Sequence, residues 1–230
     1  MSTKSSDPRK KEEANIGEIL SQSETFIEKH KKQLIYGVGG AILAVVAILG
    51  IKYAYLEPLE KDAKAAMFAS EAYFQQEQWD IALNGDGAGT IGFEEIIDQY
   101  GFTSTANLAN AYAGICYYHK GDIEKALSHL TKFSGSDKML SPSIAGLVGD
   151  CYVDLGQTQD GINQFKKAAS KADNDLISPI YLKKAGIASE SINEFKKAAE
   201  FYSSIKEEYP NSTEASDIDK YIGRAQSKIK

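Results

Sequence analysis

Apolar and polar residues divide the chain into three parts. Residues 1–32 are polar and show no sustained period, residues 33–56 are almost entirely apolar, and residues 57–230 mix the two classes at helical spacing. Helical spacing gathers apolar side chains on one face, which a folded helical domain then buries. The pattern predicts an all-α protein with a mostly disordered tail, one apolar helix and a helical domain.

The apolar part is long enough to cross a bilayer. Leu34 to Ile51 contains no charged residue, and the letters YAYL after Lys52 extend it to about 20 residues at about 1.5 Å each. A buried core helix would keep a polar face, which is missing here. A cleaved signal peptide would have a shorter apolar stretch, of about 7 to 15 residues. We therefore predict an uncleaved transmembrane helix over residues 33–56.

The flanking charges predict the orientation of this helix. Lys29, Lys31 and Lys32 precede the span and Lys52 alone follows it, and positive charge favours the cytoplasmic side. Residues 57–230 are acidic and are expected on the other side of an inner (cytoplasmic) membrane, as part of a single-pass protein. Because nucleic-acid binding needs clustered Lys and Arg, no nucleic-acid partner is expected.

Small residues follow one another within the predicted span. Gly40 and Ala44 stand four positions apart, and Gly37 lies one turn before them. This spacing permits another helix to approach closely. Simple exposure to lipid is the alternative.

Three stretches of the domain repeat one pattern. A small residue is followed 12 positions later by a second small residue and 16 positions later by a large apolar one, as two closely crossing antiparallel helices require. Glycine or asparagine falls between the two predicted helices, where a left-handed cap is needed. The three sets, with their turn residues, are Gly114, Ala126, Leu130 and Gly121; Gly149, Gly161, Phe165 and Gly156; Gly186, Ala198, Tyr202 and Asn193.

These offsets resemble the tetratricopeptide repeat, a helix-turn-helix unit of about 34 residues, and Pro210 takes its closing proline position. The resemblance implies a right-handed helical solenoid of about four repeats. A degenerate first copy is completed only if residues 84–92 are an insertion into its second helix. The predicted units are residues 63–106, 107–141, 142–178 and 179–212, with a capping helix over 213–228.

The inserted segment, within "LNGDGAGTIGFEE", has some features of a calcium-binding EF-hand loop. Counted from Asn84, it offers Asp86 at position 3 and Glu95 at position 12, but Ala88 occupies position 5, which needs an oxygen ligand. A glycine-permitted bulge between two helices explains the segment better. Calcium-dependent binding through residues 84–95 is kept as an alternative.

No catalytic residue or cofactor site is predicted. The chain contains no GxSxG, HExxH, Walker or CxxC motif. Cys116 and Cys151 occupy equivalent repeat positions on neighbouring helices, about 8–10 Å apart, which is too far for a disulfide. We expect them to be buried core residues and the protein not to be an enzyme.

A concave groove lined by the first helix of each repeat is the predicted binding site. Its lining is apolar with scattered charge, which favours extended or helical apolar segments as guests. Packing of these side chains against one another is the alternative. The predicted groove residues are Met67, Glu71 and Phe74; Ala111, Ile115 and Tyr118; Gly146, Asp150 and Val153; Lys183 and Ile187.

The whole plan resembles the YfgM-like family of single-span tetratricopeptide proteins, in its Bacteroidetes-type form. The likeness is carried by "ALNGDG", "GFEEIIDQYG" and "YAGICYYHKGDIEKAL" and covers most of residues 32–224. It implies a periplasmic domain that assists the SecYEG translocon, a membrane-anchored prolyl isomerase-like chaperone and emerging exported chains. A scaffold for another cell-envelope complex is the alternative.

Overall fold

The computed structural model describes residues 8–229, and their side chains from Lys29 onward except that of Leu34. Every regular element in these residues is helical, which agrees with the all-α prediction. The chain forms two compact units, Met1–Glu57 and Pro58–Lys230.

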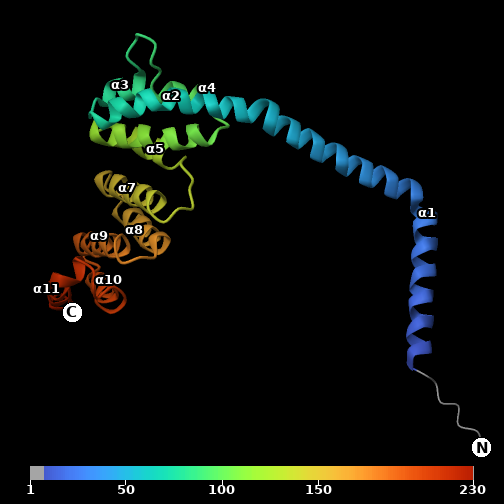
Figure 1. Cartoon of the computed structure of the whole chain (residues 1–230). Coiled ribbons are helices and arrows are strands. Elements are labelled where there is room, and N and C mark those ends of the chain that lie inside the picture. The colour runs from blue at the N-terminus through green and yellow to red at the C-terminus, as the bar shows by residue number, and fades with distance from the viewer. Residues whose placement is uncertain (1–7, 230) are drawn as a thin grey trace, which may run out of the picture. The chain divides into compact units, whose positions relative to one another are not determined.

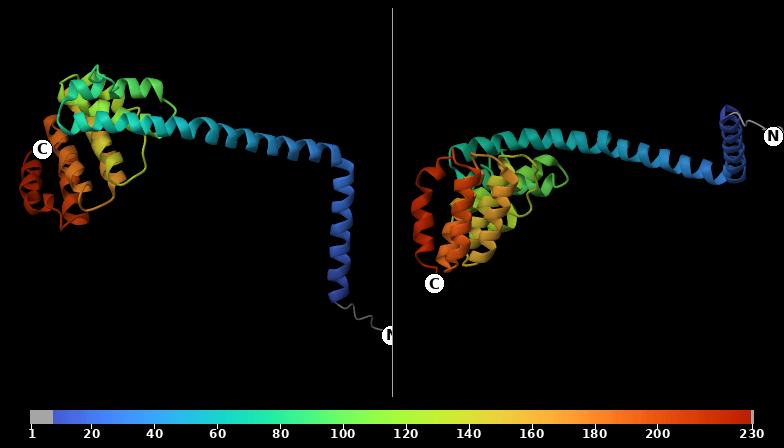
Figure 2. Two further views of the ribbon diagram at one scale, coloured as in Figure 1. Left: turned by 45° about the horizontal axis from the view of Figure 1, so that its top comes forward. Right: turned by 90° about the horizontal axis from the view of Figure 1, so that it is seen from below.

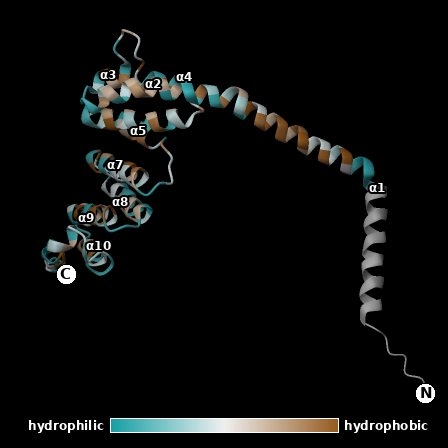
Figure 3. Ribbon diagram, in the orientation of Figure 1, coloured by the Kyte–Doolittle hydropathy of each residue, from teal (hydrophilic) through white to brown (hydrophobic). Residues whose placement is uncertain are grey.

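The first unit is one long helix. Helix α1 spans Pro8–Ile51 and continues into a short π-helix, η1, over Lys52–Leu56. Its apolar section is brown in Figure 3. Within the described helical segment Lys29–Gln75, a window of 18 residues has a mean hydropathy of 2.5, and none of it is buried. By length and composition, this helix is suited to cross a membrane.

The tail differs from its prediction. The sequence predicts mostly disordered residues over 1–32, but α1 begins at Pro8; residues 1–7 lie outside the described part. Proline is well tolerated in the first helical turn, and the Lys, Glu and Ala residues that follow are good helix formers. The prediction of disorder rests on the missing apolar period of the tail. It does not include the helix propensity of the residues there.

The second unit is a series of helix-turn-helix pairs (Figures 1 and 2). Each pair packs on the next, so that the core is divided into clusters between successive helices. The helices are α2 (Glu57–Gln75), α3 (Trp79–Asn84), α4 (Phe93–Gln99), α5 (Ser104–His119), α6 (Ile123–Leu130), α7 (Leu140–Asp154), α8 (Thr158–Ala172), α9 (Ser178–Ser191), α10 (Phe195–Glu208), η2 (Glu214–Asp217) and α11 (Ile218–Gln226).

The predicted contact between the two helices of a pair is present in all three regular copies. A Cβ atom added at Gly114 would lie 2.5 Å from Leu130 Cγ, one at Gly149 2.6 Å from Phe165 Cε1, and one at Gly186 2.3 Å from Tyr202 Cε1. Real Cβ atoms essentially never approach other atoms this closely, so each position needs glycine. The large residue 16 positions later fills the space that the glycine leaves.

The predicted turn residues have the left-handed backbone that their role requires. The φ angles are 78° at Gly121, 76° at Gly156 and 63° at Asn193. Glycine adopts this conformation without strain, and asparagine is among the few other residues that tolerate it. The repeat spacing therefore encodes both the turn and the contact beneath it.

The first helices of the regular pairs begin slightly ahead of the predicted units, at Ser104, Leu140 and Ser178 rather than at 107, 142 and 179. Side-chain caps set these starts: Thr103 accepts a hydrogen bond from Ala106 N (3.0 Å), and Asp137 accepts one from Leu140 N (2.5 Å). Capping is a local property that the repeat period does not contain.

Candidate functional site

Two predicted groove residues are part of the core. Met67 is 4% exposed and packs in the cluster that contains Phe93, and Ala111 is 1% exposed in the cluster that contains Ile144. Neither side chain can contact a partner. The position of a residue within the repeat predicts which face of the helix it lies on. It does not show how closely the neighbouring helix pair packs against that face.

Gly146, also assigned to the groove, is covered by the next repeat. A Cβ atom there would meet the ring of Tyr181, on α9, at 1.9 Å. Tyr181 therefore lies directly on the backbone of α7 and closes the groove at this point.

The groove residues of the first two pairs are half-buried. Phe74 contacts Trp79 and Tyr112 edge-on, with ring centroids 5.3 and 4.7 Å away, so it belongs to an aromatic cluster. Ile115 and Tyr118 pack against the second core cluster. Burial, with smaller contributions from Asp154 and Asp150, raises the pKa of Tyr118 to about 12. Glu71 is half-buried on α2. In these two pairs, most of the predicted groove residues pack against other side chains of the domain.

The third and fourth pairs form a pocket from the remaining predicted residues. Asp150 and Val153 of α7 and Ile187 of α9 line a cavity of about 210 Å³. Ile187 is 47% exposed, so an apolar side chain in this pocket is available to a partner. The residues that the sequence did not identify there are Phe165, Lys184, Ala188 and Ser191. We call this cavity the α7–α9 pocket.

One ion pair borders the α7–α9 pocket. Lys184 Nζ lies 2.9 and 2.7 Å from the two carboxylate oxygens of Asp150. Burial raises the pKa of Asp150, and Lys184 opposes the rise. The lysine Nζ also lies 5.7 Å from the ring centroid of Phe165. The pocket thus combines an apolar interior with one cation and one anion at its margin.

Lys183, the neighbouring predicted groove residue, has a structural role. Its Nζ lies 2.9 Å from Asp217 Oδ1 and 4.4 Å from the ring centroid of Tyr221, and it thereby fixes the C-terminal helices to α9. It is therefore not free to bind the carboxylate of a partner. The sequence shows two adjacent lysines, Lys183 and Lys184, but does not show which of them borders the pocket.

The glycine-rich insertion is a self-bonded loop between α3 and α4. The Asp86 carboxylate accepts hydrogen bonds from Ala88 N (2.8 Å), Thr90 N (3.0 Å) and Tyr73 Oη (3.0 Å). The Ala88 and Thr90 amides lower the pKa of Asp86 to about 2. Glu95 accepts a hydrogen bond from Gln99 (2.7 Å), one turn along α4. Within the described residues, no three His, Cys, Asp or Glu side chains are grouped so as to hold a metal ion.

The small residues of α1 lie on open surface. A Cβ atom added at Gly37 or Gly40 would meet nothing within 4 Å, and Ala44 is exposed. Close approach of another helix to this face therefore stays a prediction.

No protein-family model and no curated protein matches the sequence. Among solved structures, a crystal structure of MamA protein matches 72% of this chain and 91% of its own chain, with a TM-score of 0.51 and 17% identity. A second MamA crystal structure matches 60% of this chain and 84% of its own, with a TM-score of 0.43 and 18% identity. The first comparison shows that the helical domain has a tetratricopeptide-like fold.

Proposed function

We propose that this chain is a membrane-tethered protein-binding module. The observation that carries the proposal is the α7–α9 pocket, where an exposed Ile187 borders an apolar cavity on a tetratricopeptide-like fold. Folds of this type stack repeats into surfaces that bind other proteins. The exposed apolar section of α1 supplies the tether.

The size of the pocket indicates what enters it. Small-molecule sites occupy about 300–1,000 Å³, whereas this cavity measures about 210 Å³. It therefore suits one apolar side chain of a peptide segment. The Lys184 side chain remains 41% exposed beside its partner Asp150, whereas that of Lys183 is 21% exposed, so the Lys184–Asp150 pair offers a donor and an acceptor to polar groups beside that apolar side chain. The guest would be an extended or helical apolar segment.

The likeness to the YfgM-like family supports a more specific role. In this role the protein is an ancillary subunit of the SecYEG translocon in the inner membrane, with its N-terminus cytoplasmic and its domain periplasmic, and it handles exported chains together with a membrane-anchored prolyl isomerase-like chaperone. Tethering raises the local concentration of such chains, so a weak pocket suffices. The competing role is a scaffold for another cell-envelope complex.

A photo-crosslinking amino acid at Ile187, used in native membranes, tests both levels of the proposal. The matched control carries the same group at Asn163, which is exposed on α8 and does not line the pocket. Translocon subunits or a chaperone captured from Ile187 alone would support the specific role, and a different envelope protein would support the scaffold. Equal capture from both positions would refute the pocket as the binding site.

A further inference from the structure

Three loops of the domain carry strongly exposed apolar side chains. They join successive pairs and span residues 100–103, 131–139 and 173–177. Phe102 is 85% exposed, Met139 56% and Leu176 65%. Single exposed apolar residues are ordinary, but one in each of three successive connections forms a row. We call these three loops the loop edge.

Polar contacts link the start of α5, which follows the first loop, to the second loop, and the second loop to the third. Asn107, in the first turn of α5, exchanges bonds with Ser134: Asn107 Nδ2 donates to Ser134 O (2.8 Å), and Ser134 N donates to Asn107 Oδ1 (2.9 Å). Further along, Lys138 Nζ lies 3.6 Å from Asp173 Oδ2, and Asn174 Nδ2 donates to Lys138 O (3.4 Å). The exposed side chains therefore project from an ordered row.

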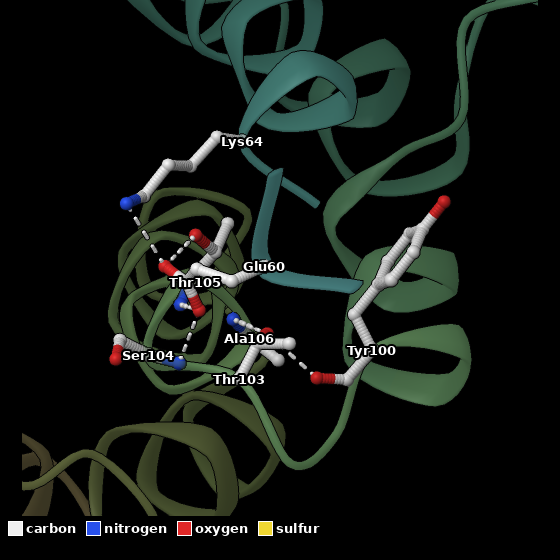
Figure 4. A network of polar contacts seen from close by, with 7 residues as sticks. All are labelled: Glu60, Lys64, Tyr100, Thr103, Ser104, Thr105 and Ala106. Carbon is white, nitrogen blue, oxygen red and sulfur yellow. Dashed lines mark hydrogen bonds and ion pairs between the residues drawn. The ribbon is translucent and has the colours of Figure 1, made fainter. Parts of the chain in front are cut away.

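The loop edge is joined to the apolar helix by only a few residues. The carboxylate of Glu60, in α2, accepts hydrogen bonds from Ser104 N (2.8 Å) and Thr105 Oγ1 (2.9 Å), directly after the first loop (Figure 4). Glu60 follows Leu56, the last residue of the apolar stretch, by four positions, or about 6 Å of helix. If the span ends at the bilayer surface, the first loop must lie close to that surface.

The charges of the loop edge suit a zwitterionic interface. Residues 100–103 carry no charge. In the second loop, Asp137 caps α7 through Leu140 N, and Lys138 pairs with Asp173 of the third. Lys132 and Asp175 are the remaining charged residues, one of each sign. The edge thus has no basic cluster to select anionic lipid, and exposed apolar side chains such as phenylalanine and leucine bury at the boundary between headgroups and acyl chains.

We propose that the loop edge rests on the lipid surface, with Phe102, Met139 and Leu176 inserted among the headgroups. This inference rests on the tether of the proposed function, since α1 must span the membrane for the edge to be held there. Its occupant is lipid rather than a protein because Glu60, four residues after the apolar stretch, is hydrogen-bonded to Ser104 and Thr105 directly after the first loop. Contact at three loops would fix the orientation of the domain on the bilayer.

Depth-dependent fluorescence quenching tests the inference on the full chain in phosphatidylcholine vesicles. An environment-sensitive thiol dye is attached at Phe102→Cys or Leu176→Cys. The matched control is Gln157→Cys, in the turn at the other end of α7 from Met139, and Leu43→Cys, 72% exposed in the apolar helix, reports insertion of the span. The native Cys116 and Cys151 are fully buried, so background labelling is low.

The inference predicts that spin-labelled lipid quenches the dye at residues 102 and 176 at least twofold more than at residue 157. Quenching at residue 43 together with equal, weak quenching at 102, 157 and 176 would overturn the loop edge and leave the tether intact. Absence of quenching at residue 43 would overturn the tether and this inference with it. If residues 102 and 176 are shielded only in native membranes and not in pure lipid, the occupant is a protein and the lipid assignment is wrong.

Discussion

Substitution of Gly186 by alanine tests the contact that holds each helix pair together. The new Cβ atom would lie 2.3 Å from Cε1 and 2.6 Å from Cζ of Tyr202. Tyr202 is fully buried, and the neighbouring clusters leave its ring no room to turn away. The helices must therefore separate or the ring must leave its preferred position.

The magnitude follows from two opposing effects. Overpacking of this kind costs about 1–3 kcal/mol. Alanine recovers about 1 kcal/mol because it favours a helix interior over glycine. We expect a net loss of up to about 2 kcal/mol, which lowers the melting temperature by up to about 8 °C in a domain of this size.

Gly223→Ala is the matched control. Gly223 also lies within a helix, α11, but a Cβ atom there would meet nothing within 4 Å. Only the gain in helix propensity applies, so the melting temperature should rise by about 2–4 °C. Both variants can be followed in detergent by circular dichroism at increasing temperature.

A double-mutant cycle identifies the atoms responsible. Alanine in place of Tyr202 removes the three ring atoms that the new Cβ would meet, Cε1, Cζ and Cδ1, so Gly186→Ala should bring no further loss in the Tyr202→Ala background. Equal melting temperatures for Gly186→Ala and Gly223→Ala, or the same loss in both Tyr202 backgrounds, would refute the assigned contact.

Three further predictions concern titratable groups. His129 is buried between Asn110 and Glu94, and burial lowers its pKa. The folded state therefore binds fewer protons than the unfolded one, so the free energy of unfolding should fall as the pH drops below about 6.5. The fall should be less steep in His129→Gln. Urea titration between pH 7 and pH 5.5 measures both. Asp86→Ala should speed amide hydrogen exchange at Ala88 and Thr90, and millimolar calcium should not raise the melting temperature of the native chain. Burial raises the pKa of both Cys116 and Cys151 to about 12, so thiol reagents at pH 8 should modify them only after addition of denaturant.

The helix pairs could be predicted because their determinants are close in sequence. A glycine, its partner 16 positions later and the turn between them all lie within one repeat, so the spacing of Gly149, Gly156 and Phe165 shows the contact directly. The groove could be predicted only in part, because its lining depends on the next repeat. Tyr181 over Gly146 and Asp217 beside Lys183 are contacts between separate units, and no periodicity within one unit reveals them.

The loop edge could not be predicted from the pattern for a different reason. Met139 precedes Leu140, which is 36% exposed, whereas Leu176 precedes Ile177, which is buried, so the neighbouring residues do not distinguish exposed apolar side chains from core ones. Both exposed residues lie in turns just before a helix: Asp137 Oδ1 accepts hydrogen bonds from Met139 N and Leu140 N, and Asn174 Oδ1 accepts them from Leu176 N and Ile177 N. A capping Asp or Asn in the sequence therefore indicates a loop between repeats in which an apolar residue can be exposed.

The two proposed contacts make a joint prediction about distance. Ile187 lies nine residues along α9 from Ser178, where the loop edge ends, which corresponds to about 14 Å of helix. If the loop edge rests on the bilayer, the α7–α9 pocket is held within about that distance of its surface. Aspartate at both Phe102 and Leu176 should release the edge and leave the pocket intact, because both side chains are exposed. Crosslinking from Ile187 should then decrease although the melting temperature is unchanged. Undiminished crosslinking in this variant would show that the tether alone positions the pocket.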